Sequence, residues 1–371
     1  MLSFQDISLL IIAGGRSSRL GVDKRFVEVG GVGLLETILR KASKVNFAEK
    51  FLCVEDELPA LKELATQYGA RLFVDEIKNS GPLSGLATGL SVVGTAWNLA
   101  VSADMPFFEF ATVSALTEKL STAQALLPKV GGRVQPLAGF YRRELAEIFK
   151  HEVLNGQRKI LSAVKKNPHE FAAVDDSANF FNVNTVGELK LARGRAANLC
   201  REIPIITVTA PASGTGKTTF IERLTLRLTA RGVKVGVIKS DAHGFNLDMS
   251  GKDSYRFQEA GARSVAVVSK SGWFLVNRTS KYAELDALIQ RMEGVDIVLI
   301  ETRTHGTFPA IALWRGLGDK NWRDDAVALF TTDPEETTEL VQFDLNDLDA
   351  AERVCAFLAG ASATSAINSI P

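Results

Sequence analysis

The stretch IIAGGRSSRLGVDK, residues 11–24, combines glycines with cations directly after an apolar run. Gly14 and Gly15 allow a sharp turn, and without a Cβ atom they let backbone N–H groups face an anion. Arg19 and Lys24 follow and add positive charge. The pattern predicts a phosphate-binding loop, and its alternative is a glycine turn before a helix with solvated cations.

Two further segments of the first half carry residues of the same chemistry. LAVSADMPFF is an apolar strand that ends in Asp104, and FFNVNT places Asn182 and Asn184 two residues apart. In a parallel sheet the carboxyl ends of the strands form the ligand edge. Asp104 is therefore suited to hold Mg²⁺ against phosphates, and the alternative is a helix N-cap or turn residue. On an extended segment both asparagines project to one side.

A second loop lies in ITVTAPASGTGKTTF, residues 206–220. A strand, a loop of small residues and an amphipathic helix surround Lys217 and Thr218, as in a Walker A motif. Backbone N–H groups and the helix N-terminus would bind the phosphates, Lys217 the β and γ oxygens, and Thr218 Mg²⁺. Pro211 stands where the motif usually has its first glycine. It has no N–H and fixes φ, so the entry to the loop must differ.

Two acidic residues follow later strands of the second half. Glu301 ends the strand VDIVLIE, where it suits Mg²⁺ or a water better than Asp296 at the start of that strand. Asp333, in FTTDPE, could accept both N–H groups of the guanine Watson–Crick edge. An N-cap before PEET is an equally good interpretation of Asp333.

The composition limits the possible functions. Hydrophobic residues make up 46% of the chain, and 43 Lys and Arg balance 43 Asp and Glu. A net charge near zero argues against extensive nucleic-acid binding, so any anion site must be local. Three widely spaced cysteines predict neither a disulfide framework nor a zinc site. The first apolar run is too short for a signal peptide or a membrane span, so we expect a cytoplasmic protein without membrane partners.

Short apolar runs alternate with amphipathic stretches, which predicts an α/β protein with parallel βαβ units. In the first half we expect strands near Ser8–Ala13, Lys50–Val54, Ala70–Val74, Trp97–Ser102, Ala125–Lys129 and Ala172–Val174. In the second half we expect them near Ile203–Ala210, Lys234–Ile238, Ser264–Ser269, Ile297–Glu301 and Ala326–Thr332. A basic helical segment ends before Pro204, so we place the boundary near Ala197–Ile203. The predicted domains are 1–198 and 199–371, each a mostly parallel sheet flanked by helices.

Five motifs in order give the first half a specific resemblance. IAGGRSSRLGVDK, SGPLSGL, ADMPFF, QPLAGFYRR and FFNVNT together resemble the molybdenum cofactor guanylyltransferase family, MobA, over about residues 7–190. The resemblance implies a Rossmann-like nucleotidyltransferase that transfers GMP from GTP to the terminal phosphate of molybdopterin or Mo-molybdopterin and releases pyrophosphate. In related enzymes an Ala-Gly-Gly opening accompanies guanine, so IAGG favours GTP over CTP.

The resemblance also implies roles for individual residues. Arg19, Lys24 and Asp104 would be catalytic, with Asp104 on Mg²⁺. Asn182 and Asn184 would bind the acceptor. The nucleotide-binding residues of this half would be Ala13, Gly14, Gly15, Asp75, Gly81 and Pro82.

The second half resembles MobB, a family of P-loop GTPases that accompany molybdenum cofactor guanylylation. The P-loop and GKDSYRFQEAGA carry this resemblance, over about residues 203–335. The family's Glu-Gly-Phe is Glu301-Thr302-Arg303 here, and its Lys-His-x-x-His is KSDAH, which lacks the first histidine. Mg²⁺ would be bound by Thr218 and Glu301. The nucleotide would be bound by Ser213, Gly214, Gly216, Lys217, Thr218, Thr219 and Asp333.

We therefore interpret the chain as a fusion of a guanylyltransferase with its P-loop partner. Its expected partners are GTP, molybdopterin and molybdoenzymes or other cofactor-biosynthesis proteins, with self-association through the second domain and weak GTPase activity there. One alternative is a related nucleotidyltransferase that uses CTP or a sugar phosphate. Another makes the second half a GTP-dependent adaptor without catalysis, because no catalytic glutamine or arginine finger is evident in the sequence.

Overall fold

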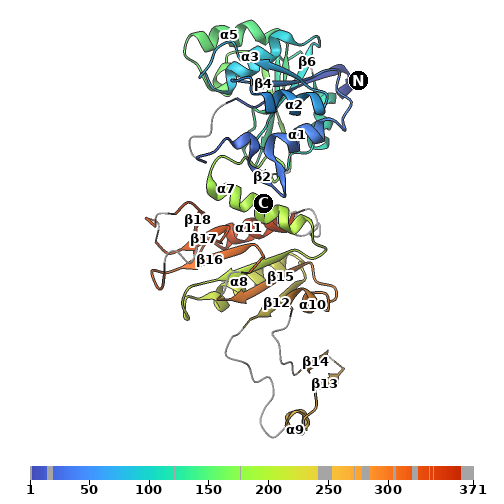
Figure 1. The fold of residues 1–371 in the computed structure, drawn as a ribbon, viewed down its shortest axis with the longest axis vertical. Coiled ribbons are helices and arrows are strands. Elements are labelled where there is room, and N and C mark those ends of the chain that lie inside the picture. The colour runs from blue at the N-terminus through green and yellow to red at the C-terminus, as the bar shows by residue number, and fades with distance from the viewer. Residues whose placement is uncertain are drawn as a thin grey trace. The chain divides into compact units, whose positions relative to one another are not determined.

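The computed structural model describes residues 2–14, 20–120, 122–175, 177–240, 253–270, 272–277, 284–303, 306–319, 325–333, 335–336 and 338–360. It contains two compact units (Figure 1). The first unit comprises Met1–Ala197 and Thr337–Gln342, and the second comprises Asn198–Glu336 and Phe343–Ile370. Each unit is a mostly parallel sheet flanked by helices, which confirms the predicted fold class.

The sheet of the first unit has the strand order β10-β7-β9-β6-β1-β4-β5, with β8 paired to β7. Its strands are β1 Ile7–Ile12, β4 Lys50–Val54, β5 Arg71–Val74, β6 Trp97–Ser102, β7 Ala125–Val130, β8 Arg133–Val134, β9 Ala138–Arg142 and β10 His169–Ala173, and β2 Glu28–Val29 with β3 Val32–Gly33 form a separate pair. Its α-helices are α1 Leu34–Ala42, α2 Pro59–Gln67, α3 Pro82–Val92, α4 Ala111–Ser114, α5 Leu145–Leu154, α6 Ile160–Val164 and α7 Val186–Leu199. Short 3₁₀ helices are η1 Phe4–Asp6, η2 Lys24–Phe26 and η3 Ala115–Lys119.

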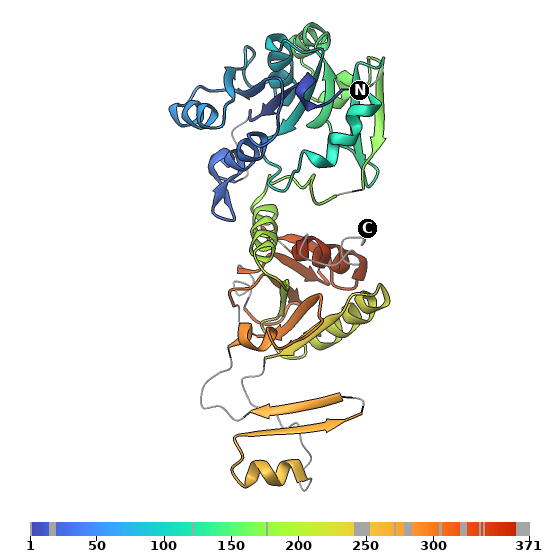
Figure 2. The same ribbon diagram turned by 90° about the vertical axis from the view of Figure 1, so that its right-hand side faces the viewer.

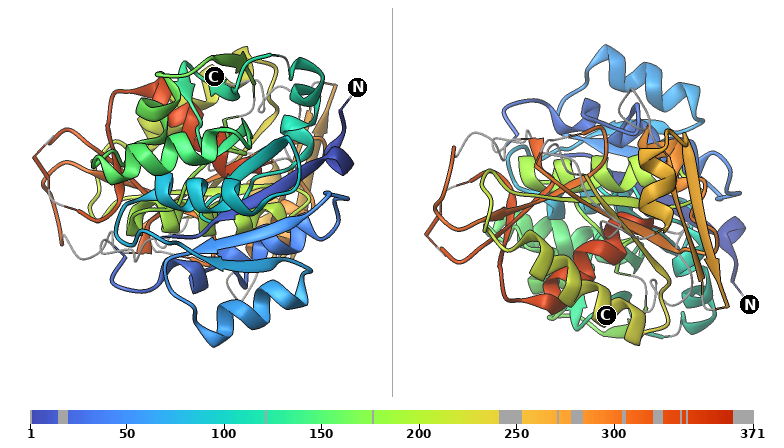
Figure 3. Two further views of the ribbon diagram at one scale, coloured as in Figure 1. Left: turned by 90° about the horizontal axis from the view of Figure 1, so that it is seen from above. Right: turned by 90° about the horizontal axis from the view of Figure 1, so that it is seen from below.

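Strand β1 lies in the middle of this sheet because its residues are buried on both faces. Successive side chains of a strand point to opposite faces. Leu9 and Ile11 therefore pack into one hydrophobic cluster with α1 and α2, and Leu10 and Ile12 into another with α3, α5 and α6. Figure 3 shows helices on both sides of these strands. A near-continuous apolar run of this kind is typical of a parallel strand covered on both faces.

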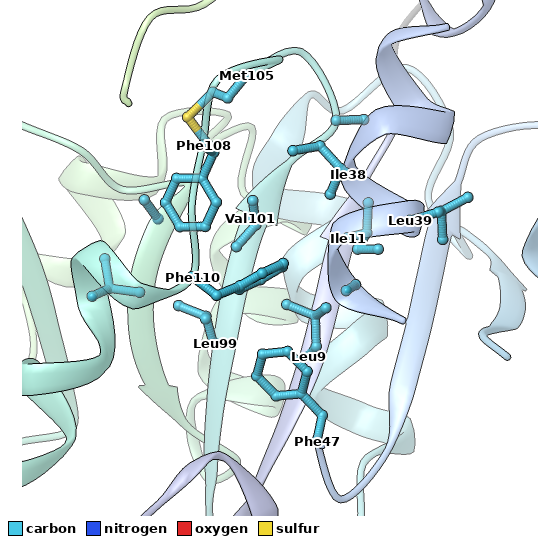
Figure 4. Close-up of a cluster of buried hydrophobic side chains, with 14 of the residues drawn as sticks. Leu9, Ile11, Ile38, Leu39, Phe47, Leu99, Val101, Met105, Phe108 and Phe110 are labelled. Atoms are coloured by element: carbon cyan, nitrogen blue, oxygen red, sulfur yellow. The ribbon is translucent and has the colours of Figure 1, made fainter. Parts of the chain in front are cut away.

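Aromatic side chains fill one end of the first cluster. Phe110 lies between Phe47 and Phe108, with ring centroids 5.2 and 5.4 Å away and edge-on geometry (Figure 4). Each such pair stabilises the fold by about 0.5–1.5 kcal/mol in addition to the contribution from burying the two rings. The cluster fixes the chain just beyond β6, at residues 105–110, and so supports the segment that carries Asp104.

Strand β9 was not expected from the sequence. It pairs antiparallel with both β6 and β7 and so joins β7 and β10 to the parallel part of the sheet. Its residues, AGFYR, belong to the motif QPLAGFYRR. The motif was interpreted only as a family signature, and glycine and arginine in a five-residue run hide its strand character.

The main sheet of the second unit has the order β12-β15-β11-β16-β17-β18. Its strands are β11 Ile205–Thr209, β12 Val235–Lys239, β15 Ile297–Thr302, β16 Ala310–Trp314, β17 Ala328–Thr331 and β18 Val341–Asp344. Its helices are α8 Lys217–Ala230, α9 Asp253–Glu259, α10 Leu285–Ile289 and α11 Leu348–Ala359. The pairs β12–β15, β15–β11, β11–β16 and β16–β17 are parallel, and β16 and β18 were not expected from the sequence.

One expected parallel strand is placed differently by the structure. Ser264–Ser269 is a strand, β13, but it pairs antiparallel with β14, Gly272–Asn277, in a separate two-stranded sheet beside α9 (Figure 2). The prediction of a parallel strand was wrong here because only two residues separate it from GWFLVN. A connection of that length makes a hairpin, and a parallel crossover needs about a dozen residues or more.

Within the part of the chain that the structure describes, no helix has the length and apolar character of a membrane span.

We expect Leu9→Ala to destabilise the first unit by about 2–5 kcal/mol, because the fully buried side chain leaves a cavity at the centre of the sheet. Leu154→Ala is a matched control on the surface of α5, with 67% of the side chain exposed, and should change stability by about 0.5 kcal/mol or less. Urea unfolding curves measure both. Equal costs for the two variants would contradict the packing described for β1.

Candidate functional site

The site of the first unit is built where β1 and β6 end. The two strands are parallel, and Ile12 lies opposite Ser102. The Ala103 N–H donates to the Ile12 carbonyl at 3.1 Å and continues the pairing one residue further. The loop that begins at Ala13 and the turn that carries Asp104 therefore leave the sheet at the same edge.

Lys24 and Asp104, 80 residues apart in the chain, form a close ion pair in this site. Lys24 Nζ lies 2.6 Å from Asp104 Oδ2, and the Ser102 hydroxyl donates to Asp104 Oδ1 at 2.5 Å. Asp104 is only 6% exposed. Both oxygens of this buried carboxylate therefore have partners, as burial of a charge requires.

The two predicted asparagines lie in the same site. Asn184 Oδ1 accepts from Lys24 Nζ at 3.3 Å, so Lys24 bridges Asp104 and Asn184. The Val183 N–H donates to the Asp104 carbonyl, and Glu188 accepts from the Asn184 N–H at 2.7 Å. These bonds hold the FNVNT segment across the end of β6. The Asn182 amide donates to the Phe180 carbonyl.

A cavity of about 320 Å³ joins these residues. Of the predicted site residues, it is lined by Ala13, Gly14, Lys24, Pro82, Asp104, Asn182 and Asn184. Gly15 and Arg19 lie outside the described residues. Gly81 precedes α3 with φ +73°, a conformation that favours glycine, and so allows Pro82 to begin the helix.

Asp75 lies behind the glycine loop. It is 3% exposed, its Oδ1 has no hydrogen-bond partner among the described residues, and its Oδ2 is 3.6 Å from where a Cβ on Gly14 would lie. Burial first, and then the charge of Glu55, raise the pKa of Asp75 to about 7. Asp75 is thus a buried carboxyl group beside Gly14, and its role in nucleotide binding stays a prediction.

The sequence interpretation missed five residues that line the cavity, Ile12, Arg25, Ser102, Ala103 and Leu137. Arg25 is buried, and both Nε and Nη2 donate to Asp23, the latter at 2.6 Å. Asp23 also accepts from the Arg25 N–H and so caps η2. A fork-shaped pair of this kind holds η2, and therefore Lys24, in one orientation. The sequence Asp23-Lys24-Arg25 places an acid two residues before an arginine, and this spacing could have indicated the Asp23–Arg25 pair.

The second site has the same plan in the other unit. Strand β11 leads into the predicted P-loop and lies parallel to β15, with Val208 opposite Glu301. Gly216 adopts a left-handed conformation, φ +94°, and α8 begins at Lys217. The Thr215 hydroxyl and Lys217 Nζ both donate to the Ala212 carbonyl, at 2.6 and 3.4 Å. The loop therefore curls around the start of α8, where the helix dipole favours anions.

Thr218 and Glu301 meet across this loop. The Thr218 hydroxyl lies 3.0 Å from each carboxylate oxygen of Glu301. The predicted partners for Mg²⁺ in the second unit are therefore brought together, although 83 residues separate them.

A cavity of about 860 Å³ extends from the P-loop across the end of β15. The predicted residues that line it are Ser213, Gly214, Gly216, Lys217, Thr218, Thr219 and Glu301. Lys239 and Arg303 also line it and were not predicted as site residues. Burial lowers the pKa of Lys217, and the positive charges of Arg303 and Lys239 lower it further against the attraction of Glu301. The site is thus a group of three cations around one carboxylate, which favours a polyanion.

Pro211, the departure from the P-loop pattern, has a close neighbour in Gly318. A Cβ on Gly318 would lie 2.8 Å from Pro211 Cβ, and Gly318 has φ +94°. Glycine is therefore required opposite the proline ring. At the start of the loop the ring of Pro211 packs against the backbone of Gly318, where the usual motif has a glycine at the position of Pro211.

Asp333 accepts a hydrogen bond from the Glu335 N–H at 3.0 Å, as a turn-capping aspartate does. Asp333 is not among the described residues that line the P-loop cavity. The capping interpretation thus has a contact in the structure, and guanine recognition by Asp333 stays a prediction.

Both sites suit Mg²⁺ by their donor atoms. Among the described residues, no three His, Cys, Asp or Glu side chains gather into a metal site. Mg²⁺ is usually held by one or two carboxylates together with substrate phosphates and water, so such a cluster is unnecessary. Asp104 in the first site and Thr218 with Glu301 in the second supply that kind of incomplete oxygen set.

Comparisons with known proteins match each half of the chain to a different family. Residues 9–170 match the family model described as MobA-like NTP transferase domain, and residues 205–332 match Molybdopterin guanine dinucleotide synthesis protein B, MobB. A "Probable molybdenum cofactor guanylyltransferase" of Natronomonas pharaonis is 30% identical over 50% of this chain and 96% of that protein. The "Molybdopterin-guanine dinucleotide biosynthesis adapter protein" of Escherichia coli K12 is 35% identical over 40% of this chain and 88% of that protein.

The chain belongs to both families, as a fusion of a MobA-like nucleotidyltransferase with MobB. This confirms the predicted resemblance. The crystal structure of Molybdopterin-guanine dinucleotide biosynthesis protein A from Archaeoglobus fulgidus is 27% identical and covers 52% of this chain and 98% of that one, with a TM-score of 0.45.

The MobA-like unit should lose stability as the pH rises through about 7, because the pKa of Asp75 in the folded unit lies above its ordinary value of 3.8. Between these values the folded state binds more protons than the unfolded state, so the free energy of unfolding falls with pH. The stabilisation is complete below about pH 4. We expect Asp75→Asn to remove this component of the slope and to make the unit more stable than the wild type above pH 7.

Urea unfolding between pH 4 and 8 measures this effect. Asp175→Asn is a matched control, since Asp175 is an exposed aspartate of the same unit. An Asp75→Asn slope equal to that of the wild type would show that Asp75 does not titrate as described.

Proposed function

We propose that the MobA-like unit transfers GMP from GTP to the terminal phosphate of molybdopterin or Mo-molybdopterin and releases pyrophosphate. The MobB unit would bind a second GTP and assist this reaction. The observation that supports the proposal best is the cavity that joins the glycine loop, the Lys24–Asp104 pair and the two asparagines. The names of the relatives supply the substrates.

The proposed reaction forms one P–O bond and breaks another. An oxygen of the acceptor phosphate attacks the α-phosphorus of GTP, the bond to the β-phosphate breaks, and the electron pair leaves with pyrophosphate. Two anions must approach each other, so the site has to neutralise charge and align the groups. Lys24 and Arg19 would contact the phosphates, and Asn182 and Asn184 would orient the acceptor.

Mg²⁺ bound at Asp104 would neutralise charge on the phosphates. The ion pair of Asp104 with Lys24 is compatible with this role. Lys24 Nζ lies against the carboxylate at 2.6 Å and has about 21% of its side chain exposed. Lys24 could therefore turn from the carboxylate to a phosphate, while Ser102 keeps its hydrogen bond to Asp104.

The glycine loop and Asp75 are the residues that we expect to select the base of the nucleotide. We propose that the Ala13-Gly14-Gly15 opening admits guanine and that Asp75, close to Gly14, contributes to nucleotide binding. CTP or a sugar phosphate as the natural substrate is the alternative, which the relatives do not favour.

In the MobB unit we propose that the P-loop and Lys217 bind the phosphates of GTP and that Thr218 and Glu301 hold Mg²⁺. Fusion keeps the two units at a high effective concentration for each other. A MobB unit that acts only as a GTP-dependent adaptor is the second candidate function, and the adapter name of the relative favours it. Partner molybdoenzymes and self-association through the MobB unit stay predictions.

The protein incubated with Mo-molybdopterin, Mg²⁺ and GTP, CTP or UTP in turn should release pyrophosphate only with GTP. Coupled detection of pyrophosphate measures the rates. A preference for CTP would contradict the assignment of the base, and release with none of the three would contradict the proposed reaction.

Asp104→Asn should lower kcat for pyrophosphate release by about 100-fold or more, because it removes the charge that pairs with the Lys24 cation and that would bind Mg²⁺. Asp175→Asn should leave the rate unchanged. Unfolding curves check that the Asp104 variant is folded. A folded variant with normal kcat would contradict the role of Asp104.

Lys217→Ala should abolish nucleotide binding by the MobB unit and leave transfer by the MobA-like unit largely intact. Calorimetric titration with a non-hydrolysable GTP analogue measures how many sites are filled, and pyrophosphate release measures transfer. Lys234→Ala, an exposed lysine of the same unit, is the control. Loss of transfer in the Lys217 variant would contradict the division of labour between the units.

A further inference from the structure

We propose that Arg303 is a catalytic residue of GTP hydrolysis in the MobB unit, where its guanidinium stabilises the γ-phosphoryl group as the β–γ bond breaks. The inference rests on the proposed nucleotide site of this unit and names the residue that would catalyse the expected GTP hydrolysis, a reaction distinct from transfer. It concerns a residue that no motif of the sequence had indicated as functional.

The position of Arg303 follows from the pairing of β15 with β11. Thr302 lies opposite Thr209, the last residue of the strand that leads into the P-loop. Arg303 is the next residue after Thr302, so it leaves the sheet beside the first residues of the loop. It lines the same cavity as Lys217 and Thr218.

Arg303 lines the same cavity as the residues expected to bind the phosphates. Its charge acts on Lys217, the residue expected to reach the β and γ oxygens. Arg303 also follows Glu301 by two residues, and Glu301 contacts the Thr218 hydroxyl at 3.0 Å. In a P-loop this hydroxyl lies at the metal that bridges the β- and γ-phosphates. Arg303 is therefore on the side of the site where the terminal phosphate would be.

The chemistry of arginine suits the transition state. The guanidinium stays protonated and offers a planar fork of donors to phosphate oxygens. The loop N–H groups and Lys217 would bind the phosphates of GTP before the reaction. A further cation at the terminal phosphate can therefore stabilise the charge that develops as the β–γ bond breaks. The Arg303 side chain is exposed, so a ligand in the cavity can reach its guanidinium. An arginine supplied in this way accelerates hydrolysis by about 10³- to 10⁵-fold in other P-loop proteins.

The proposed step uses water as the second substrate. Its oxygen attacks the γ-phosphorus, the bond to the β–γ bridging oxygen breaks, and the electron pair leaves with GDP. The proton of the water leaves with inorganic phosphate. The product therefore differs from the pyrophosphate that the MobA-like unit would release, and the two activities can be measured separately.

Release of inorganic phosphate by the full chain with GTP and Mg²⁺, without acceptor, tests the proposal. Arg303→Ala should lower kcat by about 10³-fold with little change in KM. Arg303→Lys should recover part of the loss, since lysine restores the charge without the fork. Arg291→Ala, which removes an exposed arginine of the same unit, should behave as the wild type.

An affinity measurement separates catalysis from simple binding. GDP with aluminium fluoride imitates the transferred group, and a non-hydrolysable GTP analogue imitates the ground state. Arg303→Ala should weaken binding of GDP with aluminium fluoride by about the factor by which it lowers kcat, and should leave binding of the GTP analogue unchanged. Lys217→Ala gives the background, because nucleotide that still binds to this variant is bound by the MobA-like unit.

Three outcomes would overturn the inference. The wild type could release no phosphate, Arg303→Ala could leave kcat unchanged, or Arg303→Ala could weaken both ligands equally, which would make Arg303 a binding residue. Failure of the wild-type MobB unit to bind the GTP analogue would overturn the proposed nucleotide site together with the inference. Pyrophosphate release is independent of all four results, so the proposed transfer reaction stands or fails separately.

Discussion

Parallel strand pairing is the constraint on which both sites depend. In each unit, two neighbouring parallel strands end at one edge of the sheet, β1 beside β6 and β11 beside β15. A loop of small residues follows one strand of each pair, and a carboxylate, Asp104 or Glu301, lies at the end of the other. Because the backbone hydrogen bonds fix the register, each carboxylate faces its loop, and a residue at the end of that loop donates to it, Lys24 to Asp104 and Thr218 to Glu301.

The charges around the two carboxylates are arranged differently. In the MobA-like unit, Lys24 contacts Asp104 directly, so a cation and an anion are already paired before a substrate arrives. In the MobB unit, Glu301 contacts the Thr218 hydroxyl, and the cations of the cavity repel one another. In the first site, a bound polyanion would have to replace Asp104 as the partner of Lys24. In the second site, a bound polyanion would relieve the repulsion among Lys217, Lys239 and Arg303. One arrangement suits two reacting anions, and the other suits firm retention of one nucleotide.

Local sequence signals predicted the parts of this structure that depend on local chemistry. Strands β4 and β6 have the predicted bounds because each is a mostly apolar run that ends at or just before a polar residue. The P-loop helix and the Lys24 and Asp104 side chains were likewise identified from residue type and spacing. Strands β9 and β16 were missed, because their burial comes from neighbours that are distant in the sequence. Strand β18 was missed because its residues are only partly buried.

The contacts of the sites could not be predicted in the same way. The Lys24–Asp104 bond joins residues 80 apart, and the burial that shifts the pKa of Asp75 depends on the packing of three separate segments. Arg303 was noted only as a departure from a family pattern, and its place in the cavity follows from the β11–β15 register. The assignment of 337–342 to the first unit had no signal in the sequence.

The central claim is that one chain directs GTP into two different bond cleavages. GTP labelled on the α-phosphate in one sample and on the γ-phosphate in another tests it directly, with Mo-molybdopterin present. The account predicts that the α label appears in the guanine dinucleotide in an amount equal to the pyrophosphate released, and that the γ label divides between pyrophosphate and inorganic phosphate. Loss of the γ label with no α label in the acceptor product would contradict it.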